Sequence, residues 1–167
     1  RFTGAKGVKV GGVAATNVTV QSDTSIQATT PAGTAGAADV VVTGSNDVTG
    51  TLPGGFTYTP TQISGTITDA ATNAPVTGAT AFLYNDAGSF ADSELVSAAG
   101  VFTFTNLGAG PYYVHATEWD GGYIPQAYNN VSCAFGCNPT AGTPISPVAG
   151  QTFTANFSLA KGARITG

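Results

Sequence analysis

The two cysteines are the residues best placed for covalent chemistry. Cys133 and Cys137 stand four positions apart in Cys-Ala-Phe-Gly-Cys, within a stretch rich in Gly, Asn and Pro. A c-type haem attachment needs two intervening residues and a following His, whereas Asn138 follows here. A structural zinc site needs about four ligands, and the single His is distant in sequence. The spacing therefore predicts a local disulfide, which indicates an oxidising, extracellular compartment.

The single histidine, His115, is the one plausible general base. Nucleophile-elbow and zinc-helix signatures are missing around it. Calcium takes six to eight oxygen ligands, but no Asp-x-Asp-x-Asp spacing occurs, and the acidic residues of the second half fall mostly in or beside expected turns. These are Asp86, Asp92, Glu94, Glu118 and Asp120. We therefore expect no catalytic residue, no cofactor and no metal, and hence no enzyme.

Composition narrows the class of protein further. The 167 residues include 5 basic and 9 acidic side chains, and charged residues make up 8%, against roughly 25% in ordinary domains. Scattered cations exclude a basic nucleic-acid binder, and frequent Gly and Pro exclude a coiled coil. No apolar run approaches the roughly 20 residues of a membrane span. Because 42% of residues are hydrophobic, a core can still form, and we expect an all-β fold.

The first third reads as short strands separated by turn residues. Expected strands cover residues 7–10, 17–20, 25–29, 38–43 and 55–58, and each ends at Gly, Pro, Asn or Asp. This spacing is typical of a β-sandwich.

The first third also carries a family resemblance. Val8–Ala15, Ser22–Ile26, Thr30–Gly33 and Phe56–Tyr58 resemble the IPT/TIG family, an immunoglobulin-like domain, over about residues 1–59. Family members open with a further strand pair, of which Arg1–Gly4 is the remnant here. The resemblance therefore implies a front-truncated sandwich with an open sheet edge, completed either by the parent chain upstream or by a strand from another subunit.

The second part, after a Pro60-Thr61 linker, has a different spacing of strands and turns. Strands are expected over 62–69, 78–84, 100–107, 112–119 and 153–159, with the third and fourth pairing as a hairpin across Gly108–Pro111.

This part, residues 62–161, resembles the carboxypeptidase regulatory-like family, a transthyretin-type sandwich. The resemblance is carried by Ile63–Asp69, Pro75–Ala79, Gly100–Leu107, Gly110–Tyr112 and Gly122-Tyr123. Members are non-catalytic appendages or tandem modules of exported proteins. Related collagen-adhesin B-type domains often carry a Lys–Asn isopeptide bond. Asn156 lies in the last strand, but the first strand has no Lys, so we expect no such bond.

The family pattern turns Tyr112, Val114 and Ala116 inward. Alternation then places other side chains on the opposite, outward face. The resulting candidate interface comprises Phe82, Tyr84, Tyr113, His115 and Trp119. A contiguous exposed patch of this kind requires an explanation. Three remain open: cover by the loop 121–150, contact with a neighbouring subunit or domain, and stacking on a sugar.

The end of the chain echoes the start of the second part. Gln62-Ile63-Ser64-Gly65 reappears as Arg164-Ile165-Thr166-Gly167, about one domain length later. A fixed period is typical of a tandem array. Residues 162–167 are therefore expected to open a following strand or module, and Arg164, Ile165 and Thr166 join the candidate interface as a segment that could pair with a neighbouring copy.

The expected architecture is thus two tandem β-sandwiches, immunoglobulin-like and then transthyretin-like. The expected function is a non-catalytic extracellular structural module, a repeat segment of a surface protein, stalk, adhesin or self-assembling fibre. Its expected partners are neighbouring copies or domains of the same protein, with neither nucleic acid nor a membrane span. The alternative is a carbohydrate-binding accessory of a secreted glycan-active enzyme, with Tyr113, Trp119 and Tyr123 as stacking platforms.

Overall fold

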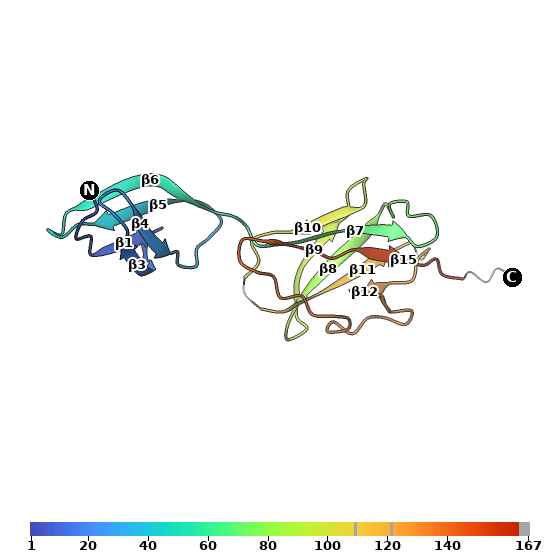
Figure 1. Ribbon diagram of the computed structural model, residues 1–167. Helices are drawn as coiled ribbons and strands as arrows, with labels where there is room; N and C mark the ends of the chain where they lie inside the picture. Colours follow the sequence, from blue (N-terminus) through green and yellow to red (C-terminus); the bar gives the residue numbers. More distant parts are fainter. Residues whose placement is uncertain (109, 121, 164–167) are drawn as a thin grey trace. The chain divides into compact units, whose positions relative to one another are not determined.

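The computed structural model describes residues 1–108, 110–120 and 122–163, and within them every regular element is a β-strand (Figure 1). The all-β expectation is therefore confirmed. The chain divides into two compact units, one covering Arg1–Thr59 and the other beginning at Pro60.

The first unit has two small sheets. A four-stranded antiparallel sheet has the order β2-β1-β5-β6, and β3 and β4 pair only with each other. The strands are β1 (Gly7–Val10), β2 (Val13–Ala14), β3 (Thr16–Val20), β4 (Ile26–Thr29), β5 (Gly36–Thr43) and β6 (Thr49–Tyr58). The expected strands are present, and β6 begins earlier than expected because residues 49–52 also pair with β5.

The core of the first unit is small. Val8 and Val10, which pair with Val42 and Val40 of β5, are its buried hydrophobic side chains. The remaining inward apolar side chains are only half-buried. They include Val18, Val20, Ile26, Ala28, Val40, Val42, Phe56 and Tyr58. Since a domain of about 60 residues is marginal even with a complete core, this unit gains little stability from burial.

The second unit is a sandwich with a continuous core. One sheet has the order β10-β7-β14, with β15 also on β7, and the other has the order β13-β12-β11-β8-β9. The strands are β7 (Gln62–Asp69), β8 (Ala79–Asn85), β9 (Phe90–Leu95), β10 (Val101–Phe104), β11 (Tyr112–Glu118), β12 (Gln126–Ala127), β13 (Val131–Ser132), β14 (Thr152–Thr154) and β15 (Phe157–Leu159). Ile63, Ile67, Leu83, Phe104 and Phe157 are among the buried side chains between the sheets.

The expected last strand, 153–159, is interrupted. β14 and β15 both run parallel to β7, and the chain between them turns so that the Asn156 side chain takes a place in the ladder. Its Oδ1 accepts a hydrogen bond from the Thr66 amide at 3.0 Å. The interruption brings the Ala155 carbonyl onto Gly65, where a Cβ atom would collide with it. Glycine at position 65 therefore permits this close approach of backbones.

Two further expectations about strands are wrong. The hairpin across Gly108–Pro111 does not form, because β10 pairs with β7 and β11 pairs with β8, in the opposite sheet. The intervening segment is instead tied back by the Leu107 amide, which donates to the Thr61 carbonyl. In addition, the sequence does not predict β9. Its Asp92 and Glu94 lie in an edge strand rather than in turns, since the edge position lets polar side chains remain in water.

We expect Gly65→Ala to destabilise the second unit by about 1–3 kcal/mol, because the added methyl group must displace the Ala155 backbone. Urea denaturation followed by the NMR methyl signals of Leu83 and Val114 measures this change. Gly108→Ala is the matched control, because a Cβ there meets only the Tyr112 hydroxyl at an ordinary 3.7 Å. Equal stabilities of the two variants would contradict the packing argument.

Candidate functional site

The candidate interface lies on the side of β8 and β11 that faces away from the core. Ala79, Ala81 and Leu83 of β8, together with Val114 and Ala116 of β11, are buried in the sandwich. The intervening side chains therefore point the other way. Register pairs Tyr113 with Tyr84, His115 with Phe82, and Thr117 with Thr80. We call this surface of β9, β8 and β11 the outer face.

One end of the outer face is covered by the loop after β13. Pro139 and Thr140 reach Gly88, and Gly142 lies close to Ala127 of β12. His115 lies beneath this loop and is 3% exposed, with its ring 4.9 Å from that of Tyr84. The loop therefore accounts for the covering of His115, while Phe82, Tyr84 and Tyr113 are half-buried.

The surroundings of His115 favour its neutral form. Burial lowers the pKa of the imidazole, and the backbone of Ala141 and of Pro139 offsets this only in part. Its Nε2 has no hydrogen-bond partner among the described residues.

The covering loop is closed by a disulfide between Cys133 and Cys137. Cys133 is buried, and its amide donates to the Pro125 carbonyl at 2.8 Å, which anchors the start of the loop beside β12. Phe135, at the tip between the two cysteines, is fully exposed. The disulfide thus fixes one end of the segment that covers His115.

The other end of the outer face is open. Trp119 is 70% exposed, and Leu95 on the neighbouring β9 is 68% exposed. The Trp119 and Phe82 rings meet edge to face, with 5.9 Å between their centroids. The Glu118 carboxylate accepts hydrogen bonds from the amides of Asp120 at 2.7 Å and Gly122 at 3.0 Å. These two bonds fix the turn that carries the indole.

A buried carboxylate that sequence analysis missed lies at the end of β7. Asp69 accepts a hydrogen bond from the Tyr123 hydroxyl at 2.9 Å, and its Oδ2 is 3.4 Å from the Lys161 ammonium. Hydrogen bonds from Tyr123 and from the amides of Ala71 and Thr72 hold the pKa of Asp69 well below its usual range, and the same carboxylate raises the pKa of Tyr123. Only the turn-forming sequence after Asp69 hinted at this role.

The Asp69 cluster has two consequences for the sequence-based expectations. Tyr123 is held by Asp69, and the Lys161 ammonium lies 5.8 Å from its ring centroid, so this ring is not open for stacking. The second consequence concerns the Lys–Asn isopeptide bond of related domains. Here Lys161 pairs with Asp69, and the Asn156 side chain bonds to Thr66. Arg164, Ile165 and Thr166 fall outside the described residues.

The described part of the chain contains no group of three or more His, Cys, Asp or Glu side chains that could hold a metal ion. In the same residues no helix is long and apolar enough to cross a membrane.

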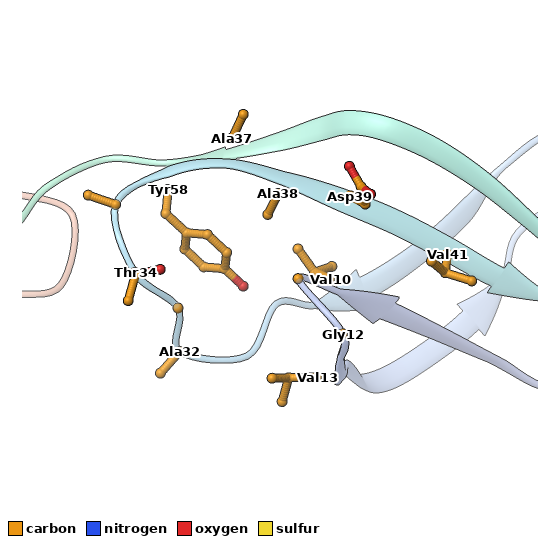
Figure 2. A pocket seen from close by; sticks show the side chains of 13 residues that line it. Val10, Gly12, Val13, Ala32, Thr34, Ala37, Ala38, Asp39, Val41 and Tyr58 are labelled. Atoms are coloured by element: carbon orange, nitrogen blue, oxygen red, sulfur yellow. The ribbon is translucent and has the colours of Figure 1, made fainter.

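The first unit holds a pocket of about 510 Å³ near the end of β1 (Figure 2). Its walls are mostly Gly, Ala, Val and Thr, and Figure 2 shows the Tyr58 side chain reaching into it. The Tyr58 hydroxyl donates to the Pro31 carbonyl, and Asp39 accepts from the Gly54 amide, so these two polar side chains already have partners. Thr34 contributes a third polar side chain. The pocket therefore offers small apolar surfaces rather than reactive groups.

Comparison with known families decides the classification. The model of the carboxypeptidase regulatory-like domain matches residues 62–160, more than half of the chain. The chain belongs to the carboxypeptidase regulatory-like family. The model of the IPT/TIG domain matches residues 2–58. Both resemblances drawn from the sequence are therefore confirmed. A search of curated proteins found no match.

Solved structures with similar folds include two pilus proteins and the Bacillus anthracis TIE protein. The pilus 2b backbone protein of group B streptococcus is 18% identical, with a TM-score of 0.45 over 74% of this chain and 50% of that one. The major pilin subunit of Bacillus cereus is 17% identical, with a TM-score of 0.43 over 93% and 55%. The Bacillus anthracis TIE protein is 19% identical, with a TM-score of 0.48 over 95% and 31%. The carboxypeptidase regulatory-like chain thus spans about half the length of the first two.

Reduction of the disulfide should loosen the loop without unfolding the carboxypeptidase regulatory-like unit. The closed loop is so short that the chain-entropy model gives only about 2 kcal/mol of stabilisation. Hydrogen exchange before and after reduction should show faster exchange in residues 129–140 and unchanged exchange in β7. Simultaneous loss of protection in β7 would contradict this expectation.

The stability of the carboxypeptidase regulatory-like unit should fall as the pH drops below about 6.5. The unfolded chain takes up a proton on His115 near that pH, whereas the folded chain, with a lowered pKa, does not until the pH is lower. The unfolded state thus binds more protons in this window, so the free energy of unfolding decreases with falling pH. Urea denaturation at pH 7.5 and 5.5 measures the effect. His115→Gln should lose most of this dependence, and an equal dependence in the variant would refute the assignment.

Proposed function

We propose that this chain is a non-catalytic structural module of an extracellular surface protein, a repeat segment of a stalk, adhesin or self-assembling fibre. Its neighbours are other copies or domains of the same protein. The observations that carry this proposal are the free sheet edges and the small core of the first unit, where a neighbouring strand would add both hydrogen bonds and apolar contact.

The free edges of the first unit favour strand addition. The β3–β4 sheet has no further strand on either side among the described residues, and β6 ends the larger sheet. Natural edge strands are normally protected by charged side chains, proline or bulges. Neither β3 nor β4 contains a charged residue or a proline. A register shift between Thr16 and Thr19 places an extra residue in β3, so β4 is the less protected of the two edges. β6 is better protected, since it contains Pro53 and a register shift opposite β5.

The side chains on β4 strengthen this argument. Ile26 and Ala28 are half-buried, and Gln27 and Thr29 are exposed, so the strand has an apolar and a polar face. An added strand with the same alternation would form backbone hydrogen bonds along the edge and cover the half-buried row beside it. Such an addition would complete the core that Val8 and Val10 only begin.

We propose residues 162–167 as a candidate donor in a neighbouring copy. The segment repeats the pattern with which β7 begins, and β7 itself pairs on both sides. Extracellular location is supported by the Cys133–Cys137 disulfide, which persists in oxidising compartments.

Deletion of residues 162–167 tests this function. The wild-type chain should form assemblies visible by electron microscopy. The deletion should abolish these assemblies, while NMR spectra show that both units of the variant remain folded. Ile165→Lys should have the same effect because a charge blocks apolar strand pairing, whereas Ile165→Val should assemble normally. Unchanged assembly of the deletion variant would rule out strand exchange by this segment, and a wild-type chain that remains monomeric at high concentration would contradict the fibre role.

A further inference from the structure

The open end of the outer face presents one aromatic ring in a fixed position. Trp119 is 70% exposed although it belongs to a well-packed unit. Its backbone turn is fixed by the two hydrogen bonds to Glu118, and its ring rests edge to face against Phe82. A side chain positioned before binding loses little conformational entropy when a ligand arrives. The indole is therefore prearranged for contact with a flat apolar surface.

Hydroxyl groups lie on the same face of the sheet as this ring. Thr80 and Thr117 lie opposite each other on β8 and β11, and Ser93 of β9 lies opposite Phe82. The patch thus combines an aromatic surface with neutral donors and acceptors, the pattern of a small-ligand site with a few orienting polar groups. Among the described residues of the second unit the sole cation is Lys161, which pairs with Asp69 away from this patch.

We propose that Trp119 and Phe82 form a stacking site for a neutral carbohydrate chain, oriented by the hydroxyls of Thr80, Thr117 and Ser93. A sugar ring has an apolar C–H surface that packs on an indole and a polar rim that bonds to hydroxyls. Because the described residues place no cation on the outer face, none of them would compensate a polyanionic polysaccharide there. The ligand class is therefore a neutral polysaccharide.

Charge argues against a second copy as the occupant. The free edge of β9 borders the patch and carries Asp92 and Glu94, and Asp120 follows Trp119. Asp92 and Glu94 lie opposite the core-facing Leu83 and Ala81, so they oppose the approach of two copies edge to edge along β9, which would bring like charges together. The exposed Asp120 adds charge next to the indole. A net charge of −4 adds to the repulsion. A neutral ligand meets no such penalty. The site does not depend on the proposed assembly, which uses the first unit and residues 162–167.

The test is affinity electrophoresis of the full chain in gels cast with neutral polysaccharides: β-glucan, xylan, mannan, galactan and starch, with alginate as the polyanion. At least one neutral polysaccharide should retard the wild-type protein. Trp119→Ala should weaken the retardation at least tenfold, and Phe82→Ala should weaken it in part. Phe135→Ala is the matched control, because it removes another fully exposed ring of the same unit and should leave retardation unchanged.

Fluorescence gives an independent readout, since Trp119 is the single tryptophan of the chain. Its emission should shift to shorter wavelength and saturate as the retarding polysaccharide is added. Absence of retardation by every neutral polysaccharide would overturn the proposal, as would equal retardation of Trp119→Ala or retardation by alginate alone. Self-association without carbohydrate that is lost in Trp119→Ala would also overturn it, because the face would then bind a second copy. NMR spectra of each variant establish that it is folded.

Discussion

The central strand β7 is the constraint on which the second unit depends. It is paired along one edge with β10 and along the other with β14 and β15, and its side chains alternate strictly between buried and half-buried. Gly65 lets the Ala155 backbone approach, so the last strand can break and continue along the same edge. At the end of β7, Asp69 holds Tyr123 and Lys161. The core, the break between β14 and β15, and the Asp69 cluster therefore all depend on contacts with β7.

The two units differ in the size of their cores and in the protection of their sheet edges. The second has a continuous core, and the exposed Trp119 and Leu95 lie on its outer face. The first has two buried hydrophobic side chains and uncharged edges. Backbone groups at such edges are satisfied by water in the free chain and by another strand when one is present. In our proposal the first unit joins copies, and the second is a stable body that presents a surface.

Sequence predicted the strands wherever alternation and turn residues agreed, as in β7 and β11. The prediction of a hairpin across Gly108–Pro111 was wrong because Gly and Pro between two strands indicate a turn, but they do not specify which sheet each strand joins. β9 was missed since its acidic residues resemble a turn, and only its edge position makes them acceptable in a strand. The split of the last strand depends on a contact between Gly65 and Ala155, far apart in sequence. Such contacts leave no local signal.

The candidate surface shows the same limit. The register of β8 and β11 places Phe82, Tyr84, Tyr113 and His115 on one face, but alternation in the sequence could not show which of them a loop would cover. The Asp69 cluster joins residues from three distant parts of the chain, so spacing could not predict it. Local periodicity thus gives the face of a strand, whereas cover and clustering depend on tertiary packing.

Hydrogen exchange in the isolated and the assembled chain tests the central claim, that a neighbour completes the first unit, most directly. The account predicts that the amides of β3 and β4 exchange rapidly in the isolated chain and become protected on assembly, while β7 stays protected in both states. Slow exchange of β3 and β4 in the isolated chain would contradict it, and so would exchange there that assembly leaves unchanged.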